Sequence, residues 1–311
     1  MADTPSKASP DGTPDAAAQP PQRGQKPRKR RTGRLVFRAL LLLLIAVPIS
    51  AALFALARPV DAERTWIGIQ RHWRHTLASY KVPLPGTPDL WNLDKRLASH
   101  GLAVGNPIFM RIFKREFELE LWMLRDGKFH RFATYPICKW SGELGPKIKT
   151  GDRQAPEGFY TVDAKALNPN SAWHRSFNLG FPNAFDRALG RSGSFLMVHG
   201  GCGSIGCYAM TNPVIDEIWK LVTSALNGGQ QRFQVQVFPF RMTESNLARH
   251  AGSPQSAFWT SLKPGYDLFD ANLTPPKVSV CGKTYAFGPG VEGSDGSAPI
   301  EAGCPTGATA R

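Results

Sequence analysis

The pattern of apolar and polar positions changes several times along the chain. The run from Ala39 to Ala57 carries no charge, and at ~1.5 Å per residue a helix of that length nearly spans the ~30 Å hydrocarbon layer of a membrane. Large side chains then recur at three- and four-residue spacing, which predicts an amphipathic helix. These side chains are Trp66, Ile69, Trp73, Leu77 and Tyr80. A second short helix is predicted over Leu90–His100.

The rhythm shifts to two residues beyond position 105, which predicts β-strands. Glutamates at 116, 118 and 120 alternate with apolar residues, and Asp126-Gly127 then predicts a tight hairpin turn. Further strands are predicted at Phe129–Ile137, Gly158–Val162, Ser194–Val198 and Phe233–Phe238. One clear helix interrupts them, with Asn212 as its cap and Gly228 at its end. The pattern therefore predicts an α+β fold, mainly β with a few helices.

The two ends of the chain have a different composition. The first 33 residues hold almost no apolar side chains, which predicts disorder, and Gly, Ser, Ala and Pro dominate from Gly288 onward. The expected organisation is a disordered basic N-terminus (1–34), a transmembrane anchor or signal peptide (35–57), a helical linker region (58–104), the main domain (105–246), a C-terminal extension (247–287) and a disordered tail (288–311).

The charge distribution predicts where the main domain lies. The chain carries 38 Lys+Arg against 24 Asp+Glu, a net charge of +14. The basic cluster Arg28–Arg31 precedes the apolar run, so the positive-inside rule predicts export of everything after Arg58. Ala55-Leu56-Ala57 resembles a signal-peptidase site, but the length of the apolar run favours an uncleaved anchor. No aromatic interleaving or known module accompanies the basic cluster, so a nucleic acid is not expected as a partner.

The densest chemical signal is the segment Phe195–Met210, in which a predicted strand runs into a glycine-rich loop that bears His199, Cys202 and Cys207. An imidazole beside a thiol favours the thiolate, which is the nucleophilic form. Backbone N–H groups around Cys207 are then placed to stabilise the oxyanion of an acyl-transfer intermediate.

Three other interpretations of this loop compete. Gly201-x-Gly203-x-x-Gly206 matches a dinucleotide-binding pattern, but no helix opens at its third glycine and no acidic residue closes the next strand. Zinc is a second possibility, with His199, Cys202 and Cys207 as ligands and His174 as a distant fourth. The third is a disulfide between Cys202 and Cys207 that holds the loop, which export permits.

The five cysteines are an odd number, so at least one thiol is expected to stay unpaired within a chain. Cys281 and Cys304 are candidates for a disulfide that pins the tail. Cys138 is expected to be buried on a strand, and Cys202 to be a loop thiol rather than a second nucleophile.

At this point the residues resemble a family. His199-Gly200 followed by Ser204-x-Gly206-Cys207 is similar to the signature of YkuD-type L,D-transpeptidases, enzymes of bacterial peptidoglycan. Further blocks between Gly105 and Asn246 resemble the YafK-like branch of this family: Tyr135-Pro-Ile-Cys138, Trp140-Ser-Gly142, Pro156-Glu-Gly-Phe-Tyr160, Leu167-Asn-Pro-Asn170, Phe177-Asn-Leu-Gly180 and Pro239-Phe-Arg-Met242. The resemblance implies a mixed β-sandwich as the catalytic domain.

The resemblance also implies roles for individual residues. Cys207 corresponds to the acylated nucleophile and His199 to the general base, while Ser204 and Gly206 shape the turn beside the oxyanion site. The family attacks the carbonyl that precedes a D-amino acid, typically at diaminopimelate in a stem peptide, and an amine or water releases the thioester. It uses no metal and no organic cofactor.

Two departures from the wider family are typical of the YafK-like branch. Only seven residues separate His199 from Cys207, and Ala209 stands where most members have arginine. That branch is associated with hydrolysis of the bond between a lipoprotein and peptidoglycan, so both water and an amine stay open as the acyl acceptor.

Substrate contacts are expected from a basic, glycine-rich loop and from two residues near the cysteine. Lys147, Lys149 and Arg153 are candidates to meet stem-peptide carboxylates, and His174 and Tyr208 to line the cleft. The expected partners are peptidoglycan stem peptides, a peptidoglycan-linked lipoprotein and the membrane. The expected location is the inner membrane with the catalytic domain in the periplasm, or the periplasm itself if the apolar segment is cleaved. The competing functions are a non-catalytic peptidoglycan-binding module with a Cys202–Cys207 disulfide and a zinc-stabilised structural domain.

Overall fold

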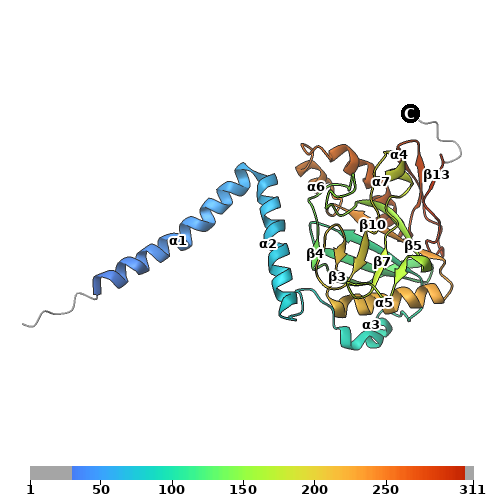
Figure 1. Ribbon diagram of the computed structural model, residues 1–311, viewed down its shortest axis with the longest axis horizontal. Helices are drawn as coiled ribbons and strands as arrows, with labels where there is room; N and C mark the ends of the chain where they lie inside the picture. The colour runs from blue at the N-terminus through green and yellow to red at the C-terminus, as the bar shows by residue number, and fades with distance from the viewer. Residues whose placement is uncertain (1–29, 305–311) are drawn as a thin grey trace, which may run out of the picture. The chain divides into compact units, whose positions relative to one another are not determined.

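A computed structural model describes residues 30–304 of the chain, which divides into two compact units at the boundary between Ala57 and Arg58. The first unit is described by one helix, α1 (Arg30–Ala57), coloured dark blue in Figure 1. It contains a candidate membrane span, Leu35–Ala57, whose large apolar side chains are all exposed. Residues 1–29 of the predicted disordered segment lie outside the described residues. Residues 30–34 belong to α1 instead, because the helix begins before the apolar run.

The second unit begins with the two helical segments that the sequence predicts. Helix α2 covers Pro59–Ser79, with proline at the first turn, where its missing N–H costs nothing. A short 3-10 turn, η1 (Leu90–Asn92), leads into α3 (Leu93–Ser99). Gly101 follows with a φ of +63°, as expected for a residue at a helix exit.

A five-stranded sheet in the order β3-β2-β1-β10-β5 forms the centre of the second unit. Its strands are β1 (Ile108–Phe113), β2 (Glu118–Arg125), β3 (Lys128–Pro136), β5 (Gly158–Asp163) and β10 (Arg232–Phe238). Strands β1 and β10 are parallel, and the other neighbours are antiparallel. Asp126 and Gly127 have φ values of 51° and 79°, so the predicted hairpin turn is confirmed.

A second sheet of short strands, in the order β4-β9-β8-β7-β6, bears the candidate site. Its strands are β4 (Lys139–Trp140), β6 (Leu167–Asn168), β7 (Ser176–Asn178), β8 (Met197–His199) and β9 (Tyr208–Ala209). The strand predicted from Ser194 begins only at Met197. Between the strands lie η2 (Ala164–Ala166) and α4 (Ala184–Ala188), and α5 (Asn212–Asn227) follows β9.

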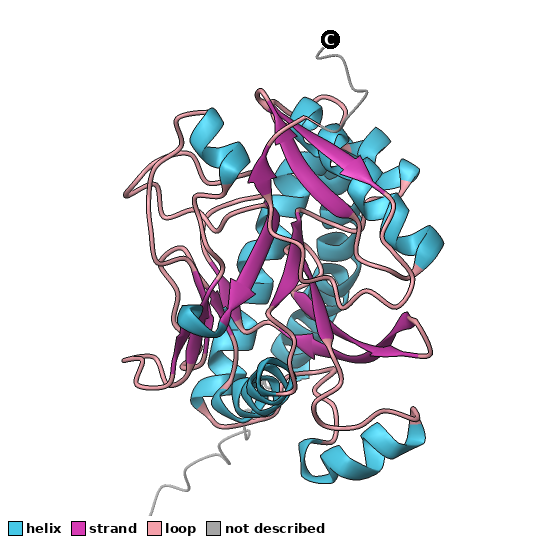
Figure 2. Cartoon of the chain, turned by 90° about the vertical axis from the view of Figure 1, so that its right-hand side faces the viewer, coloured by secondary structure: helices cyan, strands magenta, loops and turns pink. Residues whose placement is uncertain are grey.

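The main core lies between the two sheets and is closed by α5. Phe177 of the second sheet meets Phe233 of the central sheet with ring centroids 5.7 Å apart. Val198 and Tyr208 are fully buried in the same cluster, together with the apolar stripe of α5. The side-chain burial therefore gives the mixed β-sandwich that the family resemblance implies, and Figure 2 shows the strands with helices around them.

The C-terminal region covers the other face of the central sheet. It comprises α6 (Glu244–Arg249), α7 (Ser256–Asn272), β11 (Lys277–Cys281), β12 (Thr284–Gly288) and β13 (Glu301–Ala302). Phe269 of α7 packs on Phe109 of β1 with centroids 4.3 Å apart. These elements make the fold a mixed α/β one with more helix than predicted.

The prediction of a disordered tail from residue 288 is wrong for the residues that the structure describes. Strand β13 pairs in parallel with β11, and the predicted disulfide between Cys281 and Cys304 is present. Both features fix the position of this glycine-rich segment. Residues 305–311 lie outside the described part of the chain.

A fully buried ion pair fixes the loop that approaches the candidate site. Lys114 Nζ lies 2.8 Å from Glu157 Oε1 and also donates to the carbonyls of Gly145 and Ala155. The other oxygen of Glu157 accepts from Trp259 Nε1 at 2.9 Å. Burial lowers the pKa of Lys114, and the charge of Glu157 acts against that shift.

We expect Glu157→Ala to lower the free energy of unfolding by about 3–5 kcal/mol, because it leaves the Lys114 ammonium buried without its partner. Urea denaturation of the purified protein measures this change. Glu143→Ala is the matched control: it removes an ion pair with Arg64 whose side chains are 59% and 58% exposed, which is worth about 0–1 kcal/mol. Equal losses in the two variants would contradict a structural role for the buried pair.

Candidate active site

The pairing of β8 with β9 places the histidine and the free cysteine on one face of the second sheet. The strands are parallel, with Val198 opposite Tyr208 and His199 opposite Ala209. Val198 and Tyr208 point into the main core, so the alternate residues face the opposite side of the sheet. Cys207 immediately precedes β9 and lies beside Met197, whose amide N–H donates to its Sγ at 3.4 Å.

The surroundings of His199 define its tautomer and disfavour its protonated form. Its side chain is buried, and its Nδ1 lies 2.6 Å from the carbonyl oxygen of Gly200. Because a carbonyl only accepts, Nδ1 carries the proton, and Nε2 keeps a free lone pair. Burial lowers the pKa of His199, although the bond to Gly200 acts in the opposite direction.

Cys207 is the free thiol of the chain, and its surroundings shift its pKa away from the thiolate form. Burial raises its pKa; the Met197 amide and the positive charge of Lys147 act against that rise. The thiol also lies 3.6 Å from the carbonyl oxygen of Phe195, to which it donates. Among the described residues no hydrogen bond joins it to His199. Burial opposes a thiolate–imidazolium pair, because separating charge in a buried site costs desolvation energy.

The loop between the two strands is held by Ser204 rather than left open. Its hydroxyl accepts from the Cys207 amide at 3.0 Å and donates to the Cys207 carbonyl at 2.7 Å, and Ser141 bonds to it at 2.9 Å. The Cys207 amide is therefore occupied. Within residues 30–304, the amides of Ile205 and Gly206 donate to no protein acceptor, so both are free to bind a ligand. Gly206 has a φ of +118°, a conformation that a side chain would strain.

Trp173 is a site residue that sequence reasoning missed. Its ring lies 5.9 Å from the His199 ring between centroids, and it is 52% exposed. It packs so closely on the loop that a Cβ at Gly203 would come within 2.7 Å of it. The local signal for it in the sequence is weak, a single aromatic residue in a polar loop beside His174.

His174 and Asn212 fix the surroundings of the site and do not touch the thiol. His174 Nε2 bonds to Asp216 of α5 at 2.7 Å, which ties the loop of Trp173 to that helix. Asn212 was predicted to cap α5, but Thr211 occupies the N-cap position. The Asn212 side chain instead accepts from the Gly201 amide at 2.7 Å and so holds the catalytic loop.

The three basic residues predicted to contact the substrate differ in their exposure to solvent. Lys147 is buried, with its Nζ 2.5 Å from Asp152 Oδ1, and its charge reaches Cys207. Lys149 and Arg153 are exposed on the same loop. The prediction that Tyr208 lines the cleft is wrong. Its side chain lies in the core, where its hydroxyl donates to the Pro156 carbonyl, because it points to the opposite side of the sheet from Cys207.

The remaining cysteine predictions are corrected by a second disulfide. Cys202 pairs with Cys138, so it is neither a loop thiol nor a partner of Cys207. This pairing removes the Cys202–Cys207 disulfide of the non-catalytic alternative and also occupies one of the proposed zinc ligands. Among residues 30–304 no group of three or more His, Cys, Asp or Glu side chains is arranged to hold a metal ion.

Comparisons with known proteins identify the family to which the chain belongs. Residues 118–247 match the family model described as "YkuD: L,D-transpeptidase catalytic domain". The chain is 50% identical over 182 residues to a protein named "Putative L,D-transpeptidase YafK" in Escherichia coli strain K12 and in Escherichia coli O157:H7, which covers 58% of this chain and 74% of each relative.

Two solved structures also match part of the chain. The helical cell shape determining protein Pgp2 from Campylobacter jejuni is 19% identical with a TM-score of 0.35, covering 58% of this chain and 66% of that one. Bd1075 from Bdellovibrio bacteriovorus is 18% identical with a TM-score of 0.32, covering 53% and 62%. The chain thus spans a little less than two thirds of either solved chain.

The fold and the sheet that bears His199 and Cys207 define an L,D-transpeptidase-like α/β domain. The chain belongs to the YkuD family of L,D-transpeptidase catalytic domains, in its YafK-like branch.

The environment of Cys207 predicts its reactivity with pH. We expect the rate of its alkylation by iodoacetamide to rise with a midpoint above that of an exposed cysteine, because burial raises its pKa. Lys147→Met is expected to move the midpoint higher, since it removes a nearby positive charge. Lys149→Met, on the exposed part of the same loop, is the matched control and leaves the midpoint in place. A midpoint near neutral pH in the native chain would show a resting thiolate instead.

The cysteine pairing predicts a simple thiol count. Denatured, unreduced protein should contain one reactive thiol, that of Cys207, because the other four cysteines are paired. Cys207→Ala should contain none, and Cys202→Ala should contain two, since it frees Cys138. Thiol titration in denaturant measures all three. Two reactive thiols in Cys207→Ala would contradict this pairing and restore the Cys202–Cys207 disulfide, because that disulfide leaves Cys138 free and its loss would also free Cys202.

Proposed function

We propose that this chain is an exported cysteine enzyme that attacks the L,D amide bond at diaminopimelate in peptidoglycan and forms a thioester on Cys207. The observation that carries the proposal is the position of the free thiol of Cys207 and the buried imidazole of His199 on one face of the paired strands β8 and β9. Membership of a family of L,D-transpeptidase catalytic domains supports the class of substrate.

The proposed first step begins from neutral partners. As Sγ of Cys207 attacks the carbonyl carbon, Nε2 of His199 takes the thiol proton, and the new oxyanion lies near the amides of Ile205 and Gly206. The amide C–N bond then breaks, and the imidazolium of His199 gives its proton to the leaving amine. The product is a thioester on Cys207 and a neutral imidazole.

The second step repeats the same proton path with a new nucleophile. Water or an amine attacks the thioester while His199 Nε2 takes its proton, and the tetrahedral intermediate expels the Cys207 sulfur, which regains the proton. We propose water as the preferred acceptor. The buried Ala209, opposite His199, supports this choice because it offers no charge to hold an acceptor where most family members have arginine.

The N-terminal helix gives the proposed location. Its span Leu35–Ala57 is long and apolar enough to cross a membrane, and the basic residues before it favour an N-terminus in the cytoplasm. We therefore place the second unit in the periplasm, anchored to the inner membrane. A lipoprotein bound to peptidoglycan is the proposed protein partner, released when the bond to its stem peptide is hydrolysed.

The full chain incubated with muropeptides, with and without an added amine, tests the proposal by mass spectrometry of the products. We expect cleavage at diaminopimelate, a thioester adduct on Cys207, and little change when the amine is present. Cys207→Ala should abolish turnover, with a loss of at least about a thousandfold, because the nucleophile is gone.

The paired variant Cys281→Ala/Cys304→Ala is the control, since it changes two cysteines far along the chain from the site and keeps the thiol. It should retain most of the activity. Amine-linked products in place of hydrolysis would favour the transpeptidase reaction. Turnover by folded Cys207→Ala would overturn the assignment of the nucleophile.

A further inference from the structure

The amphipathic helix predicted from the sequence turns four of its five large side chains toward solvent, while Leu77 is partly buried. Trp66, Ile69 and Trp73 of α2 are 54%, 54% and 50% exposed, and Tyr80 at its end is 77% exposed. Their spacing places all four on one side of the helix. We call this set the aromatic stripe. Such a stripe on a helix surface needs a partner, because exposed aromatic residues in a contiguous patch mark an interaction site.

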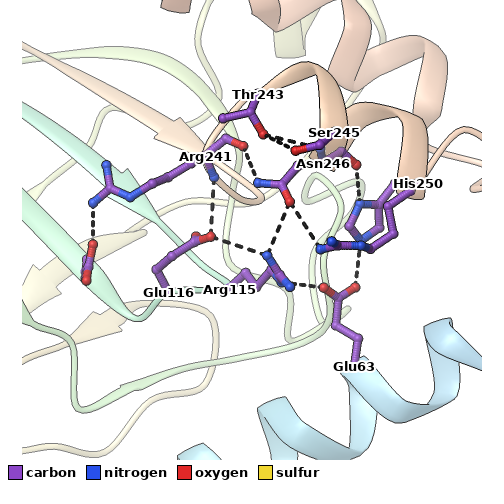
Figure 3. A network of polar contacts seen from close by, with 10 residues as sticks. Glu63, Arg115, Glu116, Arg241, Thr243, Ser245, Asn246 and His250 are labelled. Atoms are coloured by element: carbon purple, nitrogen blue, oxygen red, sulfur yellow. Dashed lines mark hydrogen bonds and ion pairs between the residues drawn. The ribbon is translucent and has the colours of Figure 1, made fainter. Parts of the chain in front are cut away.

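The opposite side of α2 is fixed to the rest of the second unit, so the aromatic stripe cannot turn inward. Glu63 bonds to both Arg115 and His250, the latter at 2.7 Å, and these bonds join α2 to the turn after β1 and to the end of α6 (Figure 3). Arg71 lies over the Trp140 ring, 4.1 Å from its centroid. These contacts leave the stripe as the free side of a held helix.

The chain itself indicates what covers the aromatic stripe. Only Arg58 separates the end of α1 from the start of α2, and one residue reaches at most about 3.6 Å. Helix α1 carries the candidate span with a mean hydropathy of 2.7, so α2 begins at a membrane surface if that span is embedded. Tryptophan and tyrosine are the residues enriched at that depth, and amphipathic helices lie in the plane of the interface.

We propose that the aromatic stripe lies in the interfacial layer of the membrane that α1 crosses, so that α2 seats the catalytic unit on the membrane surface. The proposal rests on the proposed membrane placement of α1 and is independent of the chemistry at Cys207. The proposed partner of the aromatic stripe is a phospholipid surface. Binding of the stripe to another protein or to a second copy of the chain would contradict the proposal.

The proposed attachment of α2 to the membrane has a consequence for the active site. Leu77 of α2 packs in a small buried cluster with Leu84, Cys138 and Cys202. The disulfide in that cluster joins it to the catalytic loop. A helix α2 seated on the membrane would therefore also limit how far the catalytic loop can move relative to α2.

Fluorescence quenching by lipid tests the proposal on the full chain in vesicles of brominated phosphatidylcholine. No tryptophan precedes Trp66, so α1 contributes no signal. We expect bromine near the headgroup end of the acyl chain to quench more strongly than bromine at its centre. Trp66→Phe/Trp73→Phe should lose most of this quenching and keep its fold, because phenylalanine preserves the apolar surface.

Trp91→Phe is the matched control, since Trp91 is 97% exposed and lies off the aromatic stripe; this variant should keep the quenching. Unchanged quenching in the double variant, or loss of quenching in the control, would overturn the proposal. Protection of the stripe from aqueous acrylamide without any quenching by bromine, in a chain that is dimeric in the vesicles, would overturn it in favour of a second copy. The measurement uses no substrate, so a failure of the proposed reaction leaves its result unchanged.

Discussion

The parallel pairing of β8 with β9 is the interaction on which the candidate site depends. Because Val198 and Tyr208 share the core face, alternation places His199 of β8 and Cys207, which precedes β9, on the opposite face. The two strands are only three and two residues long, so their own hydrogen bonds hold the register weakly. The loop between them is therefore held by other contacts: the Ser204 hydroxyl, the side-chain oxygen of Asn212 and the Cys138–Cys202 disulfide.

The electrostatics of this site favour two neutral partners at rest. Burial raises the pKa of Cys207 and lowers that of His199, and both shifts disfavour the thiolate–imidazolium pair. Such a pair would lose hydration without an excellent geometry to compensate. Proton transfer in the same step as attack on the substrate avoids that cost, because the charge moves onto an oxyanion that backbone amides can stabilise. The positive charge of Lys147 reduces the rise in the pKa of Cys207. The carboxylate of Asp152, which is paired with Lys147, weakens this effect.

The folded unit extends well beyond the segment that the family model matches. That segment is residues 118–247, yet β1 at Ile108–Phe113 lies in the middle of the central sheet, and α7 covers the opposite face. Helix α2 adds a third attachment through Glu63. Removing either flank would expose apolar surface of the central sheet or leave buried charges unpaired. The regions expected as a linker and an extension are therefore parts of the same structure.

The sequence by itself determined the features that depend on near neighbours along the chain. The hairpin at Asp126-Gly127, the apolar run before Arg58 and the spacing of His199 and Cys207 all follow from side-chain pattern and backbone preference within a few positions. Only the tertiary structure decided that Cys138 pairs with Cys202 across 64 positions, that Trp173 covers His199 and that Tyr208 lies in the core. It also decided that the stripe of α2 faces outward. These outcomes depend on which distant surfaces meet and in which strand register, and a local pattern of residues carries no record of either.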